Sequence, residues 1–123
     1  MASDIRGTPQ SDRLIQSEIN PGDNSWTSAY GLEGDDYLGW LSGNVEGGAG
    51  NDVIQNLAPN NRTGVGAAYW SSPRGIYADL AKQEVLDGWG GTDRLIDVYK
   101  VFGSSHQDTL LGSEGRDWFD QSE

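Results

Sequence analysis

Large apolar residues recur along this chain at a fixed place relative to glycine and aspartate. In residues 47–54, Gly-Gly-Ala-Gly-Asn-Asp-Val-Ile, the aspartate follows the third glycine by two places and the isoleucine follows the aspartate by two. Glycine permits the positive φ angles of a tight turn. An apolar residue that alternates with more polar neighbours is typical of a short strand with one buried face. The pattern therefore predicts a turn followed by a short strand.

The same order of residues occurs six times, with glycine at positions 1 and 4, aspartate at position 6 and a large apolar residue at position 8. Residues 31–38, 88–95 and 112–119 match all four positions, as 47–54 does, whereas 7–14 and 103–110 lack only the second glycine. This spacing is that of a calcium-binding nonapeptide repeat. Its glycines let turn carbonyls face a cation, and its aspartate supplies the hard oxygen that calcium prefers.

The spacing of apolar residues also predicts where the repeats are interrupted. Leu38, Val45 and Ile54 are 7 and 9 residues apart, so the turn at 40–44 is two residues short, and it has no aspartate to bind metal. Strict alternation at 75–80 predicts a strand that pairs with 67–70 in a hairpin through Ser-Ser-Pro-Arg. No segment has a helical pattern.

The chain is therefore expected to be a single module. Its parts are a degenerate repeat at 4–16, regular repeats at 31–57, and the hairpin followed by returning repeats at 67–119, within one domain of residues 1–123. The inward side chains of the later part are expected to be Ile76, Ala78, Leu80, Leu95, Val98, Val101 and Leu110.

The composition of the chain limits the kinds of molecule that it is expected to bind. Glycine makes up 18 of the 123 residues, and the net charge is −11. Such a surplus of carboxylates repels itself unless cations neutralise it, and it argues against nucleic acid, which is bound mainly through lysine and arginine. There is no cysteine for disulfides or thiolate ligands, and no apolar run long enough for a membrane span. We expect the chain to be part of a larger polypeptide.

Residues 69–112 resemble a block found in a known family. Tyr69 precedes a Gly-apolar-x-apolar-Asp-Leu strand at 75–80, a Gly-Gly-Thr-Asp-x-Leu turn at 90–95 and a Phe-Gly-Ser-x-x-x-Asp-Thr-Leu-x-Gly segment at 102–112. With the repeats, the chain resembles the hemolysin-type calcium-binding (RTX) proteins that Gram-negative bacteria secrete, long adhesins among them. The resemblance covers nearly all of residues 31–119.

This resemblance implies an all-β chain folded as a right-handed parallel β-roll, or β-solenoid, with irregular loops and a hairpin excursion. It implies a secreted or cell-surface protein, exported by a type I route, whose Ca²⁺-dependent folding is structural rather than enzymatic. The residues then expected to line calcium sites are the turn positions of the repeats: Gly31, Glu33, Gly34, Asp36, Gly47, Gly48, Gly50, Asp52, Gly88, Gly91, Asp93, Gly103, Asp108, Gly112, Gly115 and Asp117.

In such a fold, turns on the same side are two nonapeptides apart. The turns at 31–36 and 47–52 are 16 residues apart, which is two nonapeptides less the two missing residues, so Asp36 and Asp52 are expected to stack and share one ion. Asp93 and Asp108 are 15 apart and share an ion only if the stretch between them is a compact turn. Asp108 and Asp117, 9 apart, are expected to face opposite sides.

The aromatic residues suggest an alternative function. Tyr37, Trp40, Trp89 and Trp118 lie at outward strand positions or in turns. Exposed rings there favour calcium-dependent binding of an extracellular polysaccharide, whereas packing beneath the irregular loops is the other explanation.

An enzyme is the weakest hypothesis. Ser104, His106 and Asp108 contain the ingredients of a nucleophile, a base and an orienting carboxylate. Because such groups are recognised by their geometry rather than by sequence proximity, we predict no catalysis by this chain.

Overall fold

A computed structural model of the protein describes residues 5–8, 10–16, 28–57, 65–112 and 118–120, which are rich in strands and almost without helix. The strands are β1 (Ile5–Arg6), β2 (Arg13–Ile15), β3 (Ala29–Tyr30), β4 (Tyr37–Trp40), β5 (Gly43–Glu46), β6 (Val53–Asn56), β7 (Val65–Ala68), β8 (Tyr77–Asp79), β9 (Glu84–Leu86), β10 (Thr92–Ile96), β11 (Lys100–Phe102), β12 (Thr109–Leu111) and β13 (Trp118–Asp120).

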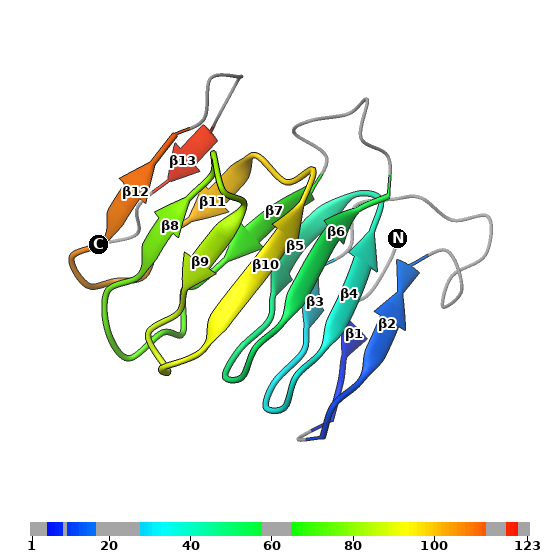
Figure 1. Cartoon of the computed structure of the whole chain (residues 1–123). Coiled ribbons are helices and arrows are strands. Elements are labelled where there is room, and N and C mark those ends of the chain that lie inside the picture. The colour runs from blue at the N-terminus through cyan, green and yellow to red at the C-terminus, as the bar shows by residue number, and fades with distance from the viewer. Residues whose placement is uncertain (1–4, 9, 17–27, 58–64, 113–117, 121–123) are drawn as a thin grey trace.

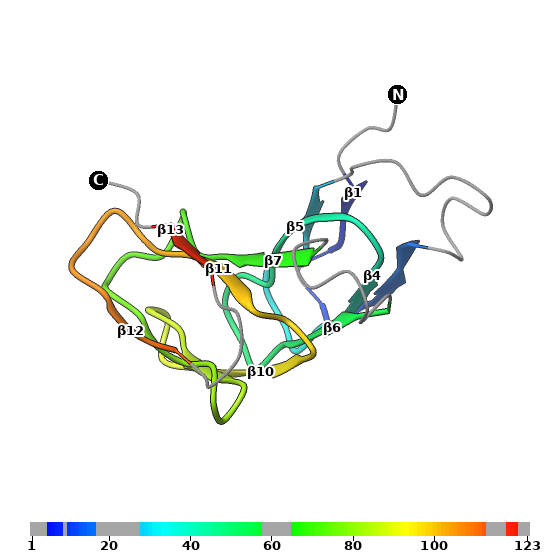
Figure 2. The same cartoon turned by 90° about the horizontal axis from the view of Figure 1, so that it is seen from above.

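The strands form two sheets, which lie as two layers (Figures 1 and 2). Sheet A has the order β1-β3-β5-β7-β11-β13 and sheet B the order β12-β8-β9-β10-β6-β4-β2. From β1 to β7 the chain alternates between the sheets, so each strand pairs in parallel with the one two places along.

The predicted right-handed parallel β-roll is wrong. Sheet A is parallel throughout, but sheet B is mixed, because β9 runs antiparallel to both β8 and β10. The strands thus make two sheets with antiparallel pairing in one of them, not a closed parallel solenoid. We call the three consecutive strands β8, β9 and β10 the meander.

The cause of the meander lies in two turns. At the first, Gln83 adopts a φ of 55° and its amide donates to the Leu80 carbonyl, which reverses the chain between β8 and β9. At the second, Asp87 Oδ1 accepts the amides of Trp89 and Gly91 while Gly90 adopts a φ of 94°. The glycine-rich segment 88–91 is therefore a hairpin turn between antiparallel strands, not a turn between parallel ones.

The predicted hairpin between 67–70 and 75–80 is also wrong. Strand β7 belongs to sheet A and β8 to sheet B, and β8 pairs with β9 instead. The inward assignment of the alternating residues is nevertheless confirmed, because Ile76, Ala78 and Leu80 are buried whereas Tyr77 is 44% exposed.

The core fills the space between the layers with one apolar cluster. The large side chains at position 8 of the regular repeats, Leu38 and Ile54, are fully buried there, together with Val45 of the shortened turn. Leu95, Val98 and Val101 of the later part are buried as predicted, and Leu110 packs against the cluster partly exposed. Burial of these residues holds the turns that precede them in a fixed stack.

No helix among the described residues is long and apolar enough to cross a membrane.

Candidate metal centre

Four buried or half-buried aspartates are stacked in a row at the N-terminal ends of β2, β4, β6 and β10, which are neighbouring strands of sheet B. Asp36 Oδ1 accepts the Asp12 amide at 2.7 Å, Asp52 Oδ1 accepts the Asp36 amide at 2.9 Å, and Asp93 Oδ1 accepts the Asp52 amide at 2.9 Å. We call Asp12, Asp36, Asp52 and Asp93 the inner ladder. Asp36, Asp52 and Asp93 thus each use one carboxylate oxygen to fix the register of the preceding turn.

The second oxygen of two inner-ladder carboxylates is buried without a hydrogen-bond partner. Asp36 is 2% exposed and Asp52 is 1% exposed, and the Oδ2 atom of each has no partner. A buried carboxylate oxygen left unpaired is costly. The missing partner has to be a hydrogen-bond donor, a proton or a cation, and a metal ion meets this requirement.

Glycine keeps open the space in front of these oxygens. A Cβ atom on Gly31 would lie 2.5 Å from Asp36 Oδ2 and 2.8 Å from the Gly47 carbonyl oxygen, so both oxygens face the same small space beside the Gly31 Cα. Gly7 repeats the arrangement, with Asp12 Oδ2 at 2.5 Å and the Gly31 carbonyl oxygen at 3.0 Å from its would-be Cβ. Carboxylate and carbonyl oxygens are ligands that hard cations such as Ca²⁺ take, so the donor set is compatible with a metal ion.

A second ladder, on the exposed side of the same turns, needs no ion. Ser11 Oγ accepts the Asp35 amide at 3.1 Å, Asp35 Oδ1 accepts the Asn51 amide at 2.9 Å, and Asn51 Oδ1 accepts the Thr92 amide at 2.8 Å. In this outer ladder each turn donates to the turn before it, whereas in the inner ladder each donates to the turn after it. The two ladders together fix the turns from both sides by hydrogen bonds alone.

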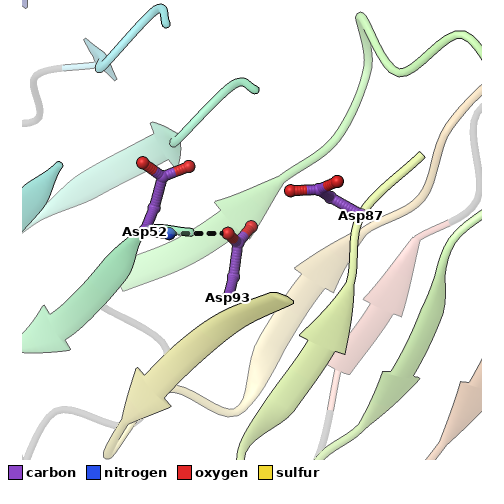
Figure 3. A group of neighbouring side chains, drawn as sticks. All are labelled: Asp52, Asp87 and Asp93. Atoms are coloured by element: carbon purple, nitrogen blue, oxygen red, sulfur yellow. Dashed lines mark hydrogen bonds between the residues drawn. The ribbon is translucent and has the colours of Figure 1, made fainter. Parts of the chain in front are cut away.

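The inner ladder meets the meander at three carboxylates, Asp52, Asp87 and Asp93, which we call the triad. One oxygen of each lies within 4.8 Å of one oxygen of the others, and all three residues are buried. Figure 3 shows the Asp87 carboxylate pointing from the meander toward the other two. Asp87 Oδ2 and Asp52 Oδ2 have no hydrogen-bond partner, whereas Tyr69 donates its hydroxyl to Asp93 Oδ2 at 2.9 Å.

Burial makes these carboxylates hard to ionise. It raises the pKa of Asp36 to about 6 and is the largest cause of the rise for Asp52, to about 9, with the Asp93 charge second. Burial likewise raises the pKa of Asp93 to about 7 and the pKa of Asp87. Neither burial nor like charge favours a carboxylate anion. A cation among them would reverse this effect, because an opposite charge favours the ionised carboxylates.

Of the pairs predicted to share an ion, the structure brings one together. The stacking of Asp36 on Asp52 is confirmed, because β4 and β6 pair with Tyr37 opposite Val53. Asp93 and Asp108 are not neighbours, because β9 and β8 lie between β10 and β12. Three strand spacings separate them, about 14 Å. Asp108 instead accepts the Ile76 amide at 2.8 Å.

The other predicted ligand positions are more dispersed. Glu33 is exposed, Gly103 is buried before the Ser104 turn, Gly112 is exposed after β12, and Gly115 and Asp117 lie outside the described residues. Gly34, Gly48 and Gly50 have φ angles of 92°, 81° and 104°, as turn glycines of the regular repeats should. Whether any of these residues binds calcium stays a prediction.

Asp87 is the site residue that the repeat pattern does not include. It precedes position 1 of the repeat at 88–95, where the pattern asks for no particular residue. The only signal in the sequence is the Asp-Gly-x-Gly-Gly composition of a turn, because aspartate often accepts the amides two or more residues further on. That its second oxygen would face Asp52 depends on the meander and could not be read from spacing.

The four candidate sugar-contacting aromatics lie in different environments. Trp40 is fully buried in the core and presents no face to a ligand, which corrects its assignment. Tyr37 is half-buried, with its hydroxyl donating to Gln55 Oε1, and Trp118 lies in β13. Trp89 is half-buried and lines a hollow of about 410 Å³. The residues around that hollow are Tyr30, Leu32, Glu33, Glu46, Gly48, Ala49, Ser71 and Trp89.

Ser104 and Asp108, two of the residues considered for catalysis, are hydrogen-bonded to each other within a turn. The Ser104 hydroxyl donates to Asp108 Oδ1 at 2.6 Å and accepts the His106 backbone amide at 3.0 Å. Ser104 is fully buried. These bonds cap a turn, which gives Ser104 a structural role. That this chain has no catalytic activity stays a prediction.

No protein-family model, curated protein or solved structure matches this chain.

Proposed function

We propose that this chain is a calcium-binding structural module that completes its folding when Ca²⁺ binds outside the cell, as part of a larger secreted protein. The observation that carries the proposal is the pair of buried, unpartnered oxygens on Asp36 and Asp52, each facing space kept open by glycine. The repeated turns and their resemblance to hemolysin-type proteins support calcium as the ion.

Calcium binding and folding are linked through the same aspartates. The inner-ladder carboxylates come together only when β2, β4, β6 and β10 are paired, so the unfolded chain has no comparable site. An ion that binds only the folded state stabilises it by RT ln(1 + [L]/Kd). Sites of extracellular modules bind Ca²⁺ with Kd values of roughly 10⁻⁴–10⁻³ M. On this basis the chain is less stable where calcium is scarce and more stable where it is abundant.

The test is a calcium titration with a matched pair of variants. Asp36→Asn and Asp35→Asn change neighbouring aspartates that each accept one backbone amide through Oδ1, but only Asp36 is buried with a free oxygen. Circular dichroism of the wild type is expected to gain β signal and thermal stability with millimolar calcium and to lose both with chelator. Asp36→Asn should reduce this gain, and Asp35→Asn should retain it.

Two outcomes would count against the proposal. A wild-type chain with the same spectrum and melting temperature in calcium and in chelator would exclude calcium-dependent folding. Equal losses in both variants would mean that removing any carboxylate from these turns weakens calcium binding through net charge alone. In that case the buried oxygen of Asp36 would have no special role.

Calcium-dependent carbohydrate binding remains the second candidate function, favoured by the hollow beside Trp89. Tyr30 and Trp89 supply aromatic surface there, and Glu33 and Glu46 supply carboxylates for sugar hydroxyls. Neutral oligosaccharides are expected to change tryptophan fluorescence in calcium but not in chelator. Trp89→Ala should abolish the change, whereas Trp70→Ala, which removes an exposed tryptophan packed on Phe102 outside the hollow lining, should not. A panel of sugars that leaves wild-type fluorescence unchanged would exclude this function.

A further inference from the structure

The triad differs in kind from the glycine turns of the inner ladder. Over Gly31 the neighbouring oxygens are one carboxylate and the carbonyl of the next turn, whereas over Gly47 the three nearest atoms all belong to Asp52. No regular repeat stacks on residues 47–54 on this side, because the strand that pairs with β6 there is β10 of the meander. At this point the meander supplies carboxylates, Asp93 from β10 and Asp87 from the turn before it.

We propose that Asp52, Asp87 and Asp93 form a separate cation site of three carboxylates, with Asp87 as a ligand contributed by the meander. The inference rests on the proposed function, and it adds a site of higher charge to the glycine-turn sites. Its ligand class is a hard divalent cation, with calcium as the fitting member. Oxygens bound to one Ca²⁺ at 2.3–2.6 Å can be up to roughly 5 Å apart, so oxygens within 4.8 Å already lie close enough to share it.

Two independent observations point to a ligand at the triad. The first is that Asp52 and Asp87 are 1% and 6% exposed, yet their Oδ2 atoms have no partner. The second is that the other oxygen of each of these two carboxylates is held by hydrogen bonds. Asp52 Oδ1 accepts the Asp36 amide and Asp87 Oδ1 accepts the amides of Trp89 and Gly91. Ligands oriented in this way from behind are a regular feature of metal sites.

Tyr69 orients one of the carboxylates of this site through a hydrogen bond. It is fully buried, and its hydroxyl donates to Asp93 Oδ2 at 2.9 Å. Loss of such a partner typically weakens metal affinity by about 10–100-fold without removing a ligand. Tyr69 is therefore a positioning residue, and Tyr69→Phe should weaken the binding of one ion while leaving the number of bound ions unchanged.

Charge predicts the order in which the sites fill. Affinity for Ca²⁺ rises with the number of charged ligands, and the triad offers three carboxylates where the space beside Gly31 offers one carboxylate and a carbonyl. We expect the triad to take the first and tightest ion. Its place between β6 and the meander means that this ion joins the regular repeats to the antiparallel strands.

The test counts ions in the full chain with calcium and follows the tight site with Tb³⁺, which replaces Ca²⁺ and is excited through nearby aromatic rings. Asp87→Asn keeps the acceptor for the Trp89 and Gly91 amides but removes the charge. The matched control is Asp79→Asn, because Asp79 Oδ1 also accepts two turn amides in the meander, from Ala81 and Lys82, and lies outside the triad. Asp87→Asn is expected to bind one calcium fewer in calorimetry and to lose the tightest Tb³⁺ signal, and Asp79→Asn to keep both.

The outcomes separate this inference from the proposed function. If the wild type binds calcium and Asp87→Asn binds the same number of ions with the same tight affinity, the triad site is refuted while calcium-dependent folding stands. If the wild type binds no ion, both fail. Should Asp87→Asn not fold, Tyr69→Phe decides: an unchanged affinity for the tightest ion overturns the assignment, and a 10–100-fold loss at constant stoichiometry supports it.

Discussion

Asp52→Asn should change the stability of this protein in opposite directions with and without calcium. Asp52 belongs to both the inner ladder and the triad, and it is 1% exposed. Asparagine has nearly the same shape and keeps the Oδ1 acceptor for the Asp36 amide. The substitution therefore removes the negative charge and one oxygen ligand while leaving the hydrogen bond between turns in place.

The expected gain without calcium follows from the pKa of Asp52. Burial and the Asp93 charge raise it from 3.8 to about 9, so at pH 7 folding favours the protonated carboxyl, whereas the unfolded chain ionises it. Each pKa unit is worth about 1.4 kcal/mol, which sets an upper limit of roughly 4 kcal/mol for the cost at pH 7. Allowing for relaxation of Asp93, we expect Asp52→Asn to stabilise the chelated protein by about 2 kcal/mol.

With calcium the sign reverses. The wild type gains the binding free energy of ions that Asp52 ligates, whereas the variant has lost a charged ligand from both sites and gains little. Urea unfolding monitored by circular dichroism measures both arms, in chelator and in millimolar calcium. At a slope of about 2 kcal/mol per molar urea, the variant's midpoint in chelator should rise by about 1 M.

The control is Asp35→Asn, which removes an exposed carboxylate of the outer ladder and leaves the buried oxygens untouched. It should change the midpoint little in either condition. If Asp52→Asn instead lowers stability equally in chelator and in calcium, Asp52 has a packing role only, and the argument from its buried charge is wrong.

Three further predictions concern pH, the glycine space and the core. The pKa values of Asp36 and Asp93 are raised to about 6 and about 7, so without calcium the folded state binds more protons than the unfolded state above pH 4. In chelator, the free energy of unfolding should therefore fall as the pH rises from 5 to 8, and the stabilisation by calcium should grow. Melting temperatures at pH 5 and pH 8, with and without calcium, check this. Gly31→Ala places a Cβ 2.5 Å from Asp36 Oδ2, so it should weaken calcium binding in calorimetry, and undiminished affinity would show that no ion uses this space. Trp40→Ala empties a fully buried position and should cost about 3–5 kcal/mol in urea unfolding, equally in calcium and in chelator, and a calcium-dependent loss would contradict a purely apolar role.

The regular repeats could be predicted because their signals are local. Glycine at the turn, aspartate two residues before an apolar side chain, and the 16-residue separation were enough to place Asp36 on Asp52 and to bury Leu38 and Ile54. Each of these features depends only on neighbouring residues and on the period of the pattern. The burial of Trp40 was missed because it was assigned to the shortened turn, whereas it ends β4 two residues after Leu38 and shares its inward face.

The meander could not be predicted because residues 87–95 fit two turns. Gly88, Gly91 and Asp93 satisfy the repeat, yet the same glycines also suit a tight reversal closed by Asp87. What decides between them is β9, a three-residue strand in which only Val85 is buried, and so short a strand has no reliable pattern of its own. Asp87 and its place in the triad were missed with it, since Asp87 approaches Asp52 only when the chain reverses.

The order of strands in sheet B also has a consequence for how the chain folds. Within the meander, β8, β9 and β10 follow one another through short turns, so their pairing closes only small loops. The pairing of β10 with β6 instead joins Arg94 to Val53 and Leu95 to Ile54, 41 residues apart in each case. Closing a longer loop costs more entropy before any contact repays it, and such non-local pairing slows folding. Docking of the meander onto β6 is therefore expected to be the slow step, and Asp52, Asp87 and Asp93 come together only when that step is complete.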